Sequence, residues 1–306
     1  MRTPPAIVGR EDELAAARQF VIDTASGPAA LVLEGVAGIG KTAIWAEAVR
    51  DARARGVALR ICRCSESDTA WAFAGLGDLF EGLDPVVLSA LPAVQQQALS
   101  AALLLDDGGR SPGHHVVGVA ILGVLRLLSR TAPLVLAVDD VQWMDTSSRN
   151  VLTFVLRRLV DEPVRLLVSH RTGVLADAAG DPGLGLSGHR MVVGPVTIGV
   201  LQRIVTTHIS QGFSRPTLIR LHQATGGNPM VSLEMARALQ RRGREPAVDE
   251  PLPVPADLRV LVTERLRLLS ESGRQVLLVA AALARPTAAA IAAAMDEPEP
   301  ATRALP

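Results

Sequence analysis

The sequence predicts a three-layer α/β/α fold, in which helices cover both faces of a mostly parallel β-sheet. One observation behind this prediction is an apolar run, a glycine-rich turn and a helical pattern that follow one another over residues 29–50. Another is that further apolar runs, typical of buried strands, alternate with helical segments up to about residue 195. Beyond that residue the pattern is helical only, which indicates further helical parts.

The first element in chain order is a helix over residues 14–22, preceded by acidic residues where the positive end of a helix favours them. A buried strand at 29–33 and a helix at 42–50 follow. Between them, residues 35–42 read Gly-Val-Ala-Gly-Ile-Gly-Lys-Thr and match the phosphate-binding loop G-x-x-x-x-G-K-[ST] at every fixed position. Strand, loop and helix in this order predict the fold of P-loop nucleoside triphosphatases.

The loop predicts a site for ATP or ADP with Mg²⁺. Its glycines allow backbone N–H groups to surround a phosphate, and the following helix directs its positive end at the same anion. Lys41, the only lysine of the chain, is expected to reach the β- and γ-phosphates, and the Thr42 hydroxyl to bind Mg²⁺. The nucleotide-binding residues predicted here are Gly35, Val36, Ala37, Gly38, Ile39, Gly40, Lys41, Thr42 and Ala43.

The next strand is expected over residues 57–64 and carries both cysteines of the chain, Cys62 and Cys64. Residues two apart on a strand share a face but are poorly placed for an unstrained disulfide, so both thiols are expected to be reduced. The two cysteines and six histidines show no spacing typical of a zinc site. Residues from about 70 to 131 have a helical pattern, which predicts a helical insertion between two strands.

An apolar strand over residues 133–140 ends in two acids, Asp139 and Asp140, about a hundred residues after the P-loop, as a Walker B element does. A carboxylate at the end of a buried strand is costly unless a cation meets it. Asp139 is therefore assigned to the magnesium shell through water, and Asp140 to orienting or deprotonating the attacking water. An ordinary acidic turn is the alternative interpretation.

A helix is expected from Asp145 to Val160, and a strand over 164–171 ends in Arg171. This arginine is a candidate for contact with a γ-phosphate; a surface-loop arginine is the alternative. A last strand at 189–194 is followed by helices and by a proline-rich acidic link at 245–255. These expected helices span residues 198–209, 216–224, 230–242, 256–269, 274–284 and 287–295, before a disordered end at 296–306.

Composition narrows the classes of partner. The formal net charge is zero and aromatic residues make up 3% of the 306 residues, so neither a global attraction to nucleic acid nor base stacking is expected. The arginine runs at 157–158 and 241–244 are interpreted as solvated faces. The alternative for the first run is a trans-acting arginine, and the alternative for the second is DNA phosphate contact.

The longest apolar stretch, 116–128, is too short to span a membrane, and no signal region begins the chain, so a soluble cytoplasmic protein is expected.

Taken together, the motifs resemble those of STAND-class signal-transduction ATPases, which are related to AAA ATPases, and in particular the nucleotide-binding part of large ATP-binding regulators of the LuxR type. The motifs lie in order at residues 7–13, 34–42, 139–145 and 226–229. The resemblance implies that Val8, Gly9 and Arg10 line the adenine side of the site. It also implies that Arg171 acts as a sensor arginine and that Pro229 packs on the base from a helical lid.

The same resemblance implies three domains: an ATPase domain at 1–195, a lid at 196–245 and a partial winged-helix region at 256–306. Similar full-length regulators carry a sensor region and a carboxyl-terminal helix-turn-helix, both beyond this chain, so no direct DNA contact is expected from it. The implied mechanism is a switch: ADP favours a closed form, ATP an open form that self-associates, and slow hydrolysis resets the open form.

The motifs also exclude some other classes of nucleotide-binding protein and leave others open. A GTPase needs an Asn-Lys-x-Asp motif, which the single lysine in the P-loop excludes, and an ABC transporter subunit needs a Leu-Ser-Gly-Gly-Gln signature, which the chain lacks. A small-molecule kinase stays open, since P-loops also position ATP for transfer to a hydroxyl. The stronger alternative is a DNA-binding AAA-type module of the replication-initiator kind, although no dense basic stripe favours it.

Overall fold

The computed structural model describes residues 7–23, 27–103, 113–172, 181–209, 212–247, 250–253, 266, 269–283 and 287–295. The chain divides into two compact units, Met1–Val200 and Leu201–Pro306. The division falls within helix α8, Ile198–His208, a few residues beyond the expected domain end at 195.

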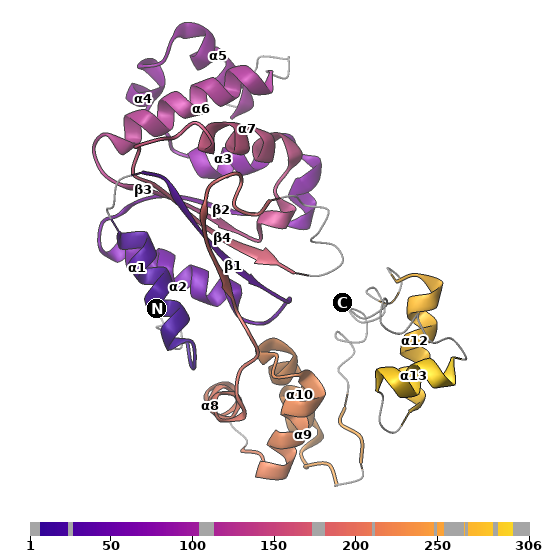
Figure 1. Ribbon diagram of the computed structural model, residues 1–306. Coiled ribbons are helices and arrows are strands. Elements are labelled where there is room, and N and C mark those ends of the chain that lie inside the picture. The colour runs from indigo at the N-terminus through magenta and orange to yellow at the C-terminus, as the bar shows by residue number, and fades with distance from the viewer. Residues whose placement is uncertain are drawn as a thin grey trace. The chain divides into compact units, whose positions relative to one another are not determined.

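A five-stranded parallel sheet forms the middle of the first unit (Figure 1). Its strand order is β2-β3-β4-β1-β5. Parallel strands end at the same edge, so the loops that follow β1, β3 and β4 lie together, with β4 in the middle. The strands are β1 Ala29–Gly35, β2 Ala58–Arg63, β3 Leu134–Asp139, β4 Val164–Arg171 and β5 Gly188–Val192.

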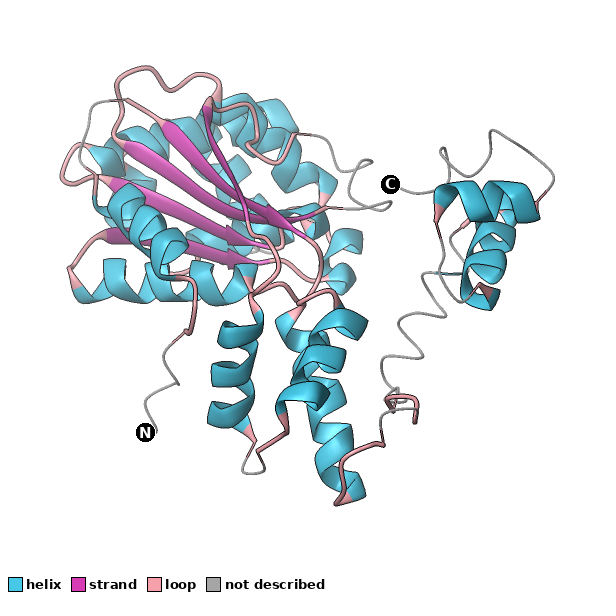
Figure 2. Ribbon diagram, turned by 60° about the horizontal axis from the view of Figure 1, so that its bottom comes forward, coloured by secondary structure: helices cyan, strands magenta, loops and turns pink. Residues whose placement is uncertain are grey.

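Helices cover both faces of this sheet, which confirms the three-layer prediction (Figure 2). One face packs against α1, Glu11–Ile22, and α2, Lys41–Ala54. The other face packs against α3, α6 and α7. The helices between β2 and β4 are α3 Ala74–Phe80, α4 Pro85–Ser89, α5 Ala93–Ala102, α6 His114–Ser129 and α7 Thr146–Leu156, with short 3-10 turns at Glu66–Ala70 and Val141–Trp143.

The central strand β3 explains why the strands read as continuous apolar runs. Every residue of β3 is buried, because a parallel strand between two helical layers has no solvent face. Alternate side chains enter different cores: Leu134, Leu136 and Val138 lie on the α6–α7 side, whereas Val135 and Ala137 lie on the α2 side. Asp139, the next residue, therefore points to the α2 side, where the P-loop lies.

Several element ends differ from the sequence prediction. β1 continues to Gly35 because this residue still pairs with Arg171 of β4. α2 continues to Ala54 and ends just before Gly56, whose φ of +73° glycine adopts without strain. The helix expected to run to Val160 ends at Leu156, and Val160 is 71% exposed.

The second unit is helical in the part of the chain that the structure describes. α9, Arg215–Thr225, ends at Gly226 in the left-handed region, and Asn228 caps the start of α10, Pro229–Arg242, by accepting the Val231 N–H. Two further helices of the described residues are α12 Glu271–Ala282 and α13 Ala288–Ala294. Most of the helix expected at 256–269, and all of the end expected to be disordered at 296–306, lie outside the described residues.

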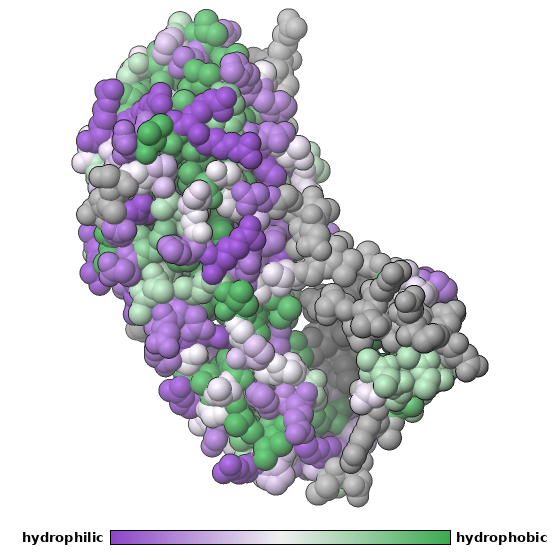
Figure 3. Space-filling model, in the orientation of Figure 1, coloured by the Kyte–Doolittle hydropathy of each residue, from purple (hydrophilic) through white to green (hydrophobic). Residues whose placement is uncertain are grey.

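The surface of the first unit mixes apolar with hydrophilic side chains, as Figure 3 shows over the region of α4, α5 and α6. Val86 and Val94 in this region are 71% and 69% exposed. Isolated apolar side chains of this kind are usual on protein surfaces. Of the helices in the described ranges, none has the length and apolar character needed to cross a membrane.

Candidate nucleotide-binding site

The loop between β1 and α2 has the backbone that its glycines predict. Gly38 and Gly40 have φ angles of +78° and +111°, which residues with a side chain avoid. Gly35 is needed for another reason: a Cβ atom there would lie 2.8 Å from the carbonyl oxygen of Val193. Gly40 also caps α2 without a side chain, which leaves the first turn of that helix open to an anion.

Lys41 is folded back onto this loop. Its Nζ donates to the carbonyl oxygens of Gly35, at 2.8 Å, and Val36, at 3.0 Å, and the residue is only 4% exposed. Burial lowers the pKa of Lys41 from its ordinary 10.5 to about 8, and the nearby carboxylate of Asp140 only partly offsets this effect. The ammonium group is therefore held inside the loop by weak carbonyl acceptors, which an anionic phosphate can replace.

The two residues assigned to magnesium are in contact. The Thr42 hydroxyl donates to Oδ1 of Asp139 at 3.2 Å, and the hydroxyl of Ser169 donates to the same oxygen at 2.5 Å. Burial raises the pKa of Asp139, and these hydrogen bonds oppose that rise. One hydroxyl and one carboxylate fit Mg²⁺, which keeps several waters and takes its other ligands from phosphates. No group of three or more His, Cys, Asp or Glu side chains suited to a metal occurs among the described residues.

Asp140 and Arg171 form a two-pronged ion pair. The Arg171 Nε and Nη2 atoms donate to the two carboxylate oxygens at 3.1 and 2.9 Å. Burial alone would raise the pKa of Asp140, but hydrogen bonds from Arg171 and Gln142 outweigh it and hold the pKa below its usual value. Asp140 is therefore ionised, and in this structure its charge faces Arg171.

Sequence reasoning missed two residues that link these groups. Ser169 donates its hydroxyl proton to Asp139 and accepts the backbone N–H of Asp140 at 2.8 Å. Gln142 donates to Asp140 at 2.9 Å and accepts the backbone N–H of Arg171 at 3.1 Å. The polar end of the strand at 164–171 was a signal for Ser169, but only the position of β4 beside β3 brings it to the acids.

A comparison with known families decides what kind of domain carries this site. Residues 6–168, more than half of the chain, match the AAA ATPase domain family. The chain belongs to this family. Its P-loop and acidic strand end are therefore those of an AAA ATPase domain, and the family implies nucleotide binding, typically with Mg²⁺.

Three individual proteins are similar to this AAA domain at low sequence identity. Over 210 residues, 59% of this chain, it is 27% identical to an uncharacterized protein of Rhizobium meliloti (strain 1021), and it spans 20% of that protein's length. The structure of the Aeropyrum pernix ORC1 protein in complex with DNA is 18% identical, with a TM-score of 0.48 over 96% of this chain and 78% of the other. Brucella abortus NtrX in complex with ATP is 12% identical, with a TM-score of 0.44 over 100% and 69%.

The segment before α1 contacts the P-loop of the AAA domain through Arg10. This arginine is 6% exposed and donates to the carbonyl oxygens of Ile39, at 3.0 Å, and Gly194, at 2.5 Å. Gly9 lies against α8, since a Cβ atom there would be 2.4 Å from Val200. The guanidinium of Arg10 thus ties the loop to the chain that follows β5. Its expected place beside adenine, with Val8 and Gly9, stays a prediction.

Proposed function

We propose that this AAA domain is an ATP- and ADP-binding regulatory switch of the STAND class, the nucleotide-binding part of a LuxR-type transcriptional regulator. The observation that carries the proposal is the convergence of Lys41, the Thr42–Asp139 pair and the Asp140–Arg171 pair at one edge of the sheet. A phosphate-binding loop, a magnesium pair and an arginine that contacts the catalytic acid are the parts needed to tell ATP from ADP.

Binding would begin with an exchange of partners at Lys41. Its ammonium leaves the carbonyl oxygens of Gly35 and Val36 and donates to phosphate, a stronger, charged acceptor. Thr42 and Asp139 would hold Mg²⁺, which supplies positive charge that neutralises the phosphates. Ser169 keeps Asp139 oriented through its short hydrogen bond.

Arg171 gives the site a way to sense the γ-phosphate. In this structure it pairs with Asp140, and a γ-phosphate offers a competing acceptor for the same guanidinium. Transfer of Arg171 to that phosphate would free Asp140 to orient and deprotonate water. ADP lacks this acceptor and leaves the ion pair in place. Differential contacts of this kind are the source of energy for a switch.

The proposal also assigns the residues around the adenine and the bounds of the domains. Val8, Gly9 and Arg10 would line the adenine side, and Pro229, the first residue of α10, would contact the base from the lid. We assign residues 1–195 to the ATPase domain with its helical insertion at about 70–131, residues 196–245 to the lid and residues 256–306 to a partial winged-helix region. Full-length relatives would add the sensor and DNA-binding regions.

Asp140→Asn is expected to keep nucleotide binding while stopping ATP hydrolysis, so that the protein stays self-associated in ATP. The substitution removes the base but suits the backbone, because Asp140 has a φ of +52° and asparagine tolerates this region. Phosphate release and light scattering after size exclusion measure both effects, with ADP as the matched control. If the wild type and the variant each had the same oligomeric size in ATP as in ADP, the switch would be ruled out.

Nucleotide affinity is expected to fall as the pH rises through about 8, the pKa of Lys41 in the free site. A bound phosphate raises this pKa again, so the bound state keeps a proton that the free state loses above pH 8. The affinity should then decrease by up to about tenfold per pH unit above 8. Calorimetry at pH 8 in two buffers of different ionisation heat should give different observed heats, because binding takes up protons from the buffer; equal observed heats in the two buffers would contradict the role of Lys41.

The arginine run at 241–244 does not favour the alternative of a DNA-binding module. Arg242 and Arg244 pair with Glu250, at 3.3 and 2.7 Å, so two of its charges have an acidic partner within the same unit. Salt-dependent affinity for duplex DNA would revive that alternative.

A further inference from the structure

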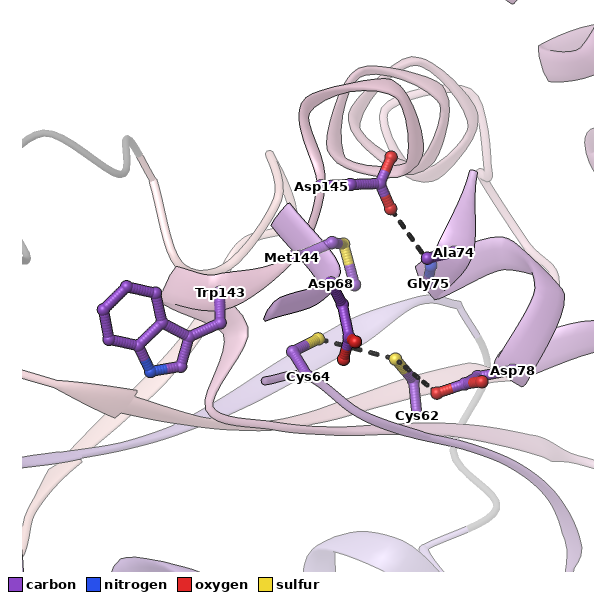
Figure 4. A pocket seen from close by; sticks show the side chains of 9 residues that line it. All are labelled: Cys62, Cys64, Asp68, Ala74, Gly75, Asp78, Trp143, Met144 and Asp145. Atoms are coloured by element: carbon purple, nitrogen blue, oxygen red, sulfur yellow. Dashed lines mark hydrogen bonds between the residues drawn. The ribbon is translucent and has the colours of Figure 1, made fainter. Parts of the chain in front are cut away.

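Both cysteines of the chain line one small pocket at the end of β2 (Figure 4). The pocket has a volume of about 110 Å³ and lies on the α3 side of the sheet. Cys62 belongs to the hydrophobic core there, whereas Cys64, just beyond the strand, is half-buried. A volume of this size has room for several waters or for a small molecule such as hydrogen peroxide, but not for a peptide or a nucleotide.

The two sulfur atoms touch each other. The Sγ atoms of Cys62 and Cys64 are 3.4 Å apart, and the Cys62 thiol also donates to Oδ2 of Asp78 at 3.7 Å. Figure 4 shows the three groups in a row, with Cys62 in the middle, so they do not surround a common point as metal ligands would. The pair is thus a dithiol in contact at the edge of a pocket.

The two thiols differ in reactivity. Contact with Cys64 and burial together raise the pKa of Cys62 well above its usual range, so its thiol stays protonated. Cys64 is more exposed, and the thiolate is the reactive form of cysteine. Cys64 is therefore the residue that meets an oxidant first, and Cys62 lies in contact with it as a resolving thiol.

We propose that Cys62 and Cys64 form a reversible disulfide when the protein meets a hydroperoxide, and that this bond weakens nucleotide binding. With hydrogen peroxide, the Cys64 thiolate attacks one oxygen, the O–O bond breaks, and the leaving hydroxide takes up a proton to give water and a Cys64 sulfenic acid. The Cys62 sulfur then attacks the Cys64 sulfur while its thiol proton moves to Asp78, which already accepts its hydrogen bond. That proton and the sulfenic hydroxyl leave as a second water, so two thiols are oxidised as one peroxide is reduced.

The disulfide reaches the nucleotide site through the backbone. The N–H of Cys64 donates to the carbonyl oxygen of Asp139 at 3.1 Å, and Arg63 pairs with Asp139 in the sheet. A disulfide requires the sulfur atoms to approach to about 2.05 Å, a spacing that residues two apart on a strand reach only with strain. Closure therefore moves the backbone at Cys64 and weakens its hydrogen bond to the magnesium-binding residue.

Strain also makes the bond reversible. Disulfides that strain their surroundings have higher reduction potentials and are reduced more easily than structural ones. The Cys62–Cys64 disulfide is thus a regulatory bond, which forms under peroxide and opens with cellular thiols. The effect on nucleotide binding rests on the function proposed above, whereas formation of the bond does not.

To test this, the purified chain is treated with hydrogen peroxide. Its mass, its free thiols after denaturation and its affinity for ADP are then measured. The expected result is a mass loss of two hydrogen atoms, two blocked thiols, and an affinity lower by about fivefold, as loss of one hydrogen bond near the site would give. Dithiothreitol should restore all three, which excludes methionine oxidation as the cause. Cys64→Ser, with the same treatment, should keep its affinity.

Formation of the bond and its effect on nucleotide binding are refuted by different outcomes. Both thiols still free after peroxide, a sulfinic acid at Cys64, or a disulfide between two chains would each refute the intramolecular bond. An intramolecular disulfide with unchanged ADP affinity would refute its regulatory effect. Failure of the reduced protein to bind ADP would instead refute the proposed function, while mass and thiol content still decide whether the bond forms.

Discussion

Lys41→Ala should lower the affinity for ADP and ATP by at least about a hundredfold, since the side chain is expected to make two charged contacts with phosphate and each contributes about tenfold or more. Alanine removes the ammonium group that the structure keeps within the loop, where no other lysine of the chain can replace it. Calorimetric titration with ADP in the presence of Mg²⁺ measures the loss.

The matched control for this variant lies on the same helix. Arg50→Ala removes a cation from α2 whose side chain is 52% exposed and pairs with the half-buried Glu47. Its effect on nucleotide affinity should stay within about twofold, because exposed ion pairs contribute little. Equal ADP affinity in wild type and Lys41→Ala would mean that the P-loop does not hold the nucleotide.

The largest expected effect on stability is that of Asp145→Ala. The Asp145 carboxylate is buried and accepts three backbone N–H groups, from Phe73 at 2.9 Å, Gly75 at 3.0 Å and Ser148 at 2.8 Å. It thereby caps α7 and fixes the start of α3. Alanine leaves all three donors unpaired in the interior, which should lower the free energy of unfolding by about 4 kcal/mol.

Urea unfolding followed by tryptophan fluorescence measures this loss, because all three tryptophans, Trp45, Trp71 and Trp143, belong to the first unit. Asp84→Ala is the control: Asp84 also caps a helix but accepts a single exposed N–H, from Val86. It should cost about 1 kcal/mol. Equal losses for the two variants would show that the contacts of Asp145 with α3 contribute nothing.

The parts of the fold that sequence predicted are those with local signals. The P-loop is a contiguous pattern of residues. Asp145 was expected to start a helix and does cap α7, because an N-cap residue binds backbone groups that follow it closely in the chain. Buried strands such as β3 follow from an unbroken apolar run. The two cysteines were expected to be reduced and are free thiols, one buried and one half-buried.

Contacts between distant segments were the parts that sequence could not supply. The strand order places β4 between β1 and β3, and no local pattern encodes it. Ser169 contacts both acids only because of this order, and Arg10 reaches Ile39 and Gly194 only in the folded chain. Asp145 likewise binds Phe73 across the helical insertion. Such residues look like ordinary polar positions until the sheet is assembled.

The central claim is that Lys41 lies in an adenine-nucleotide site. Its most direct test incubates the wild-type chain with an amine-reactive acyl-phosphate derivative of ATP, with and without excess ADP, and maps the labelled residue by mass spectrometry. With a single lysine in the chain, assignment of the label is unambiguous. Labelling of Lys41 that ADP blocks is the predicted result. No labelling, from protein that carries no nucleotide after purification, would contradict the claim and make this AAA domain a scaffold without a working nucleotide site.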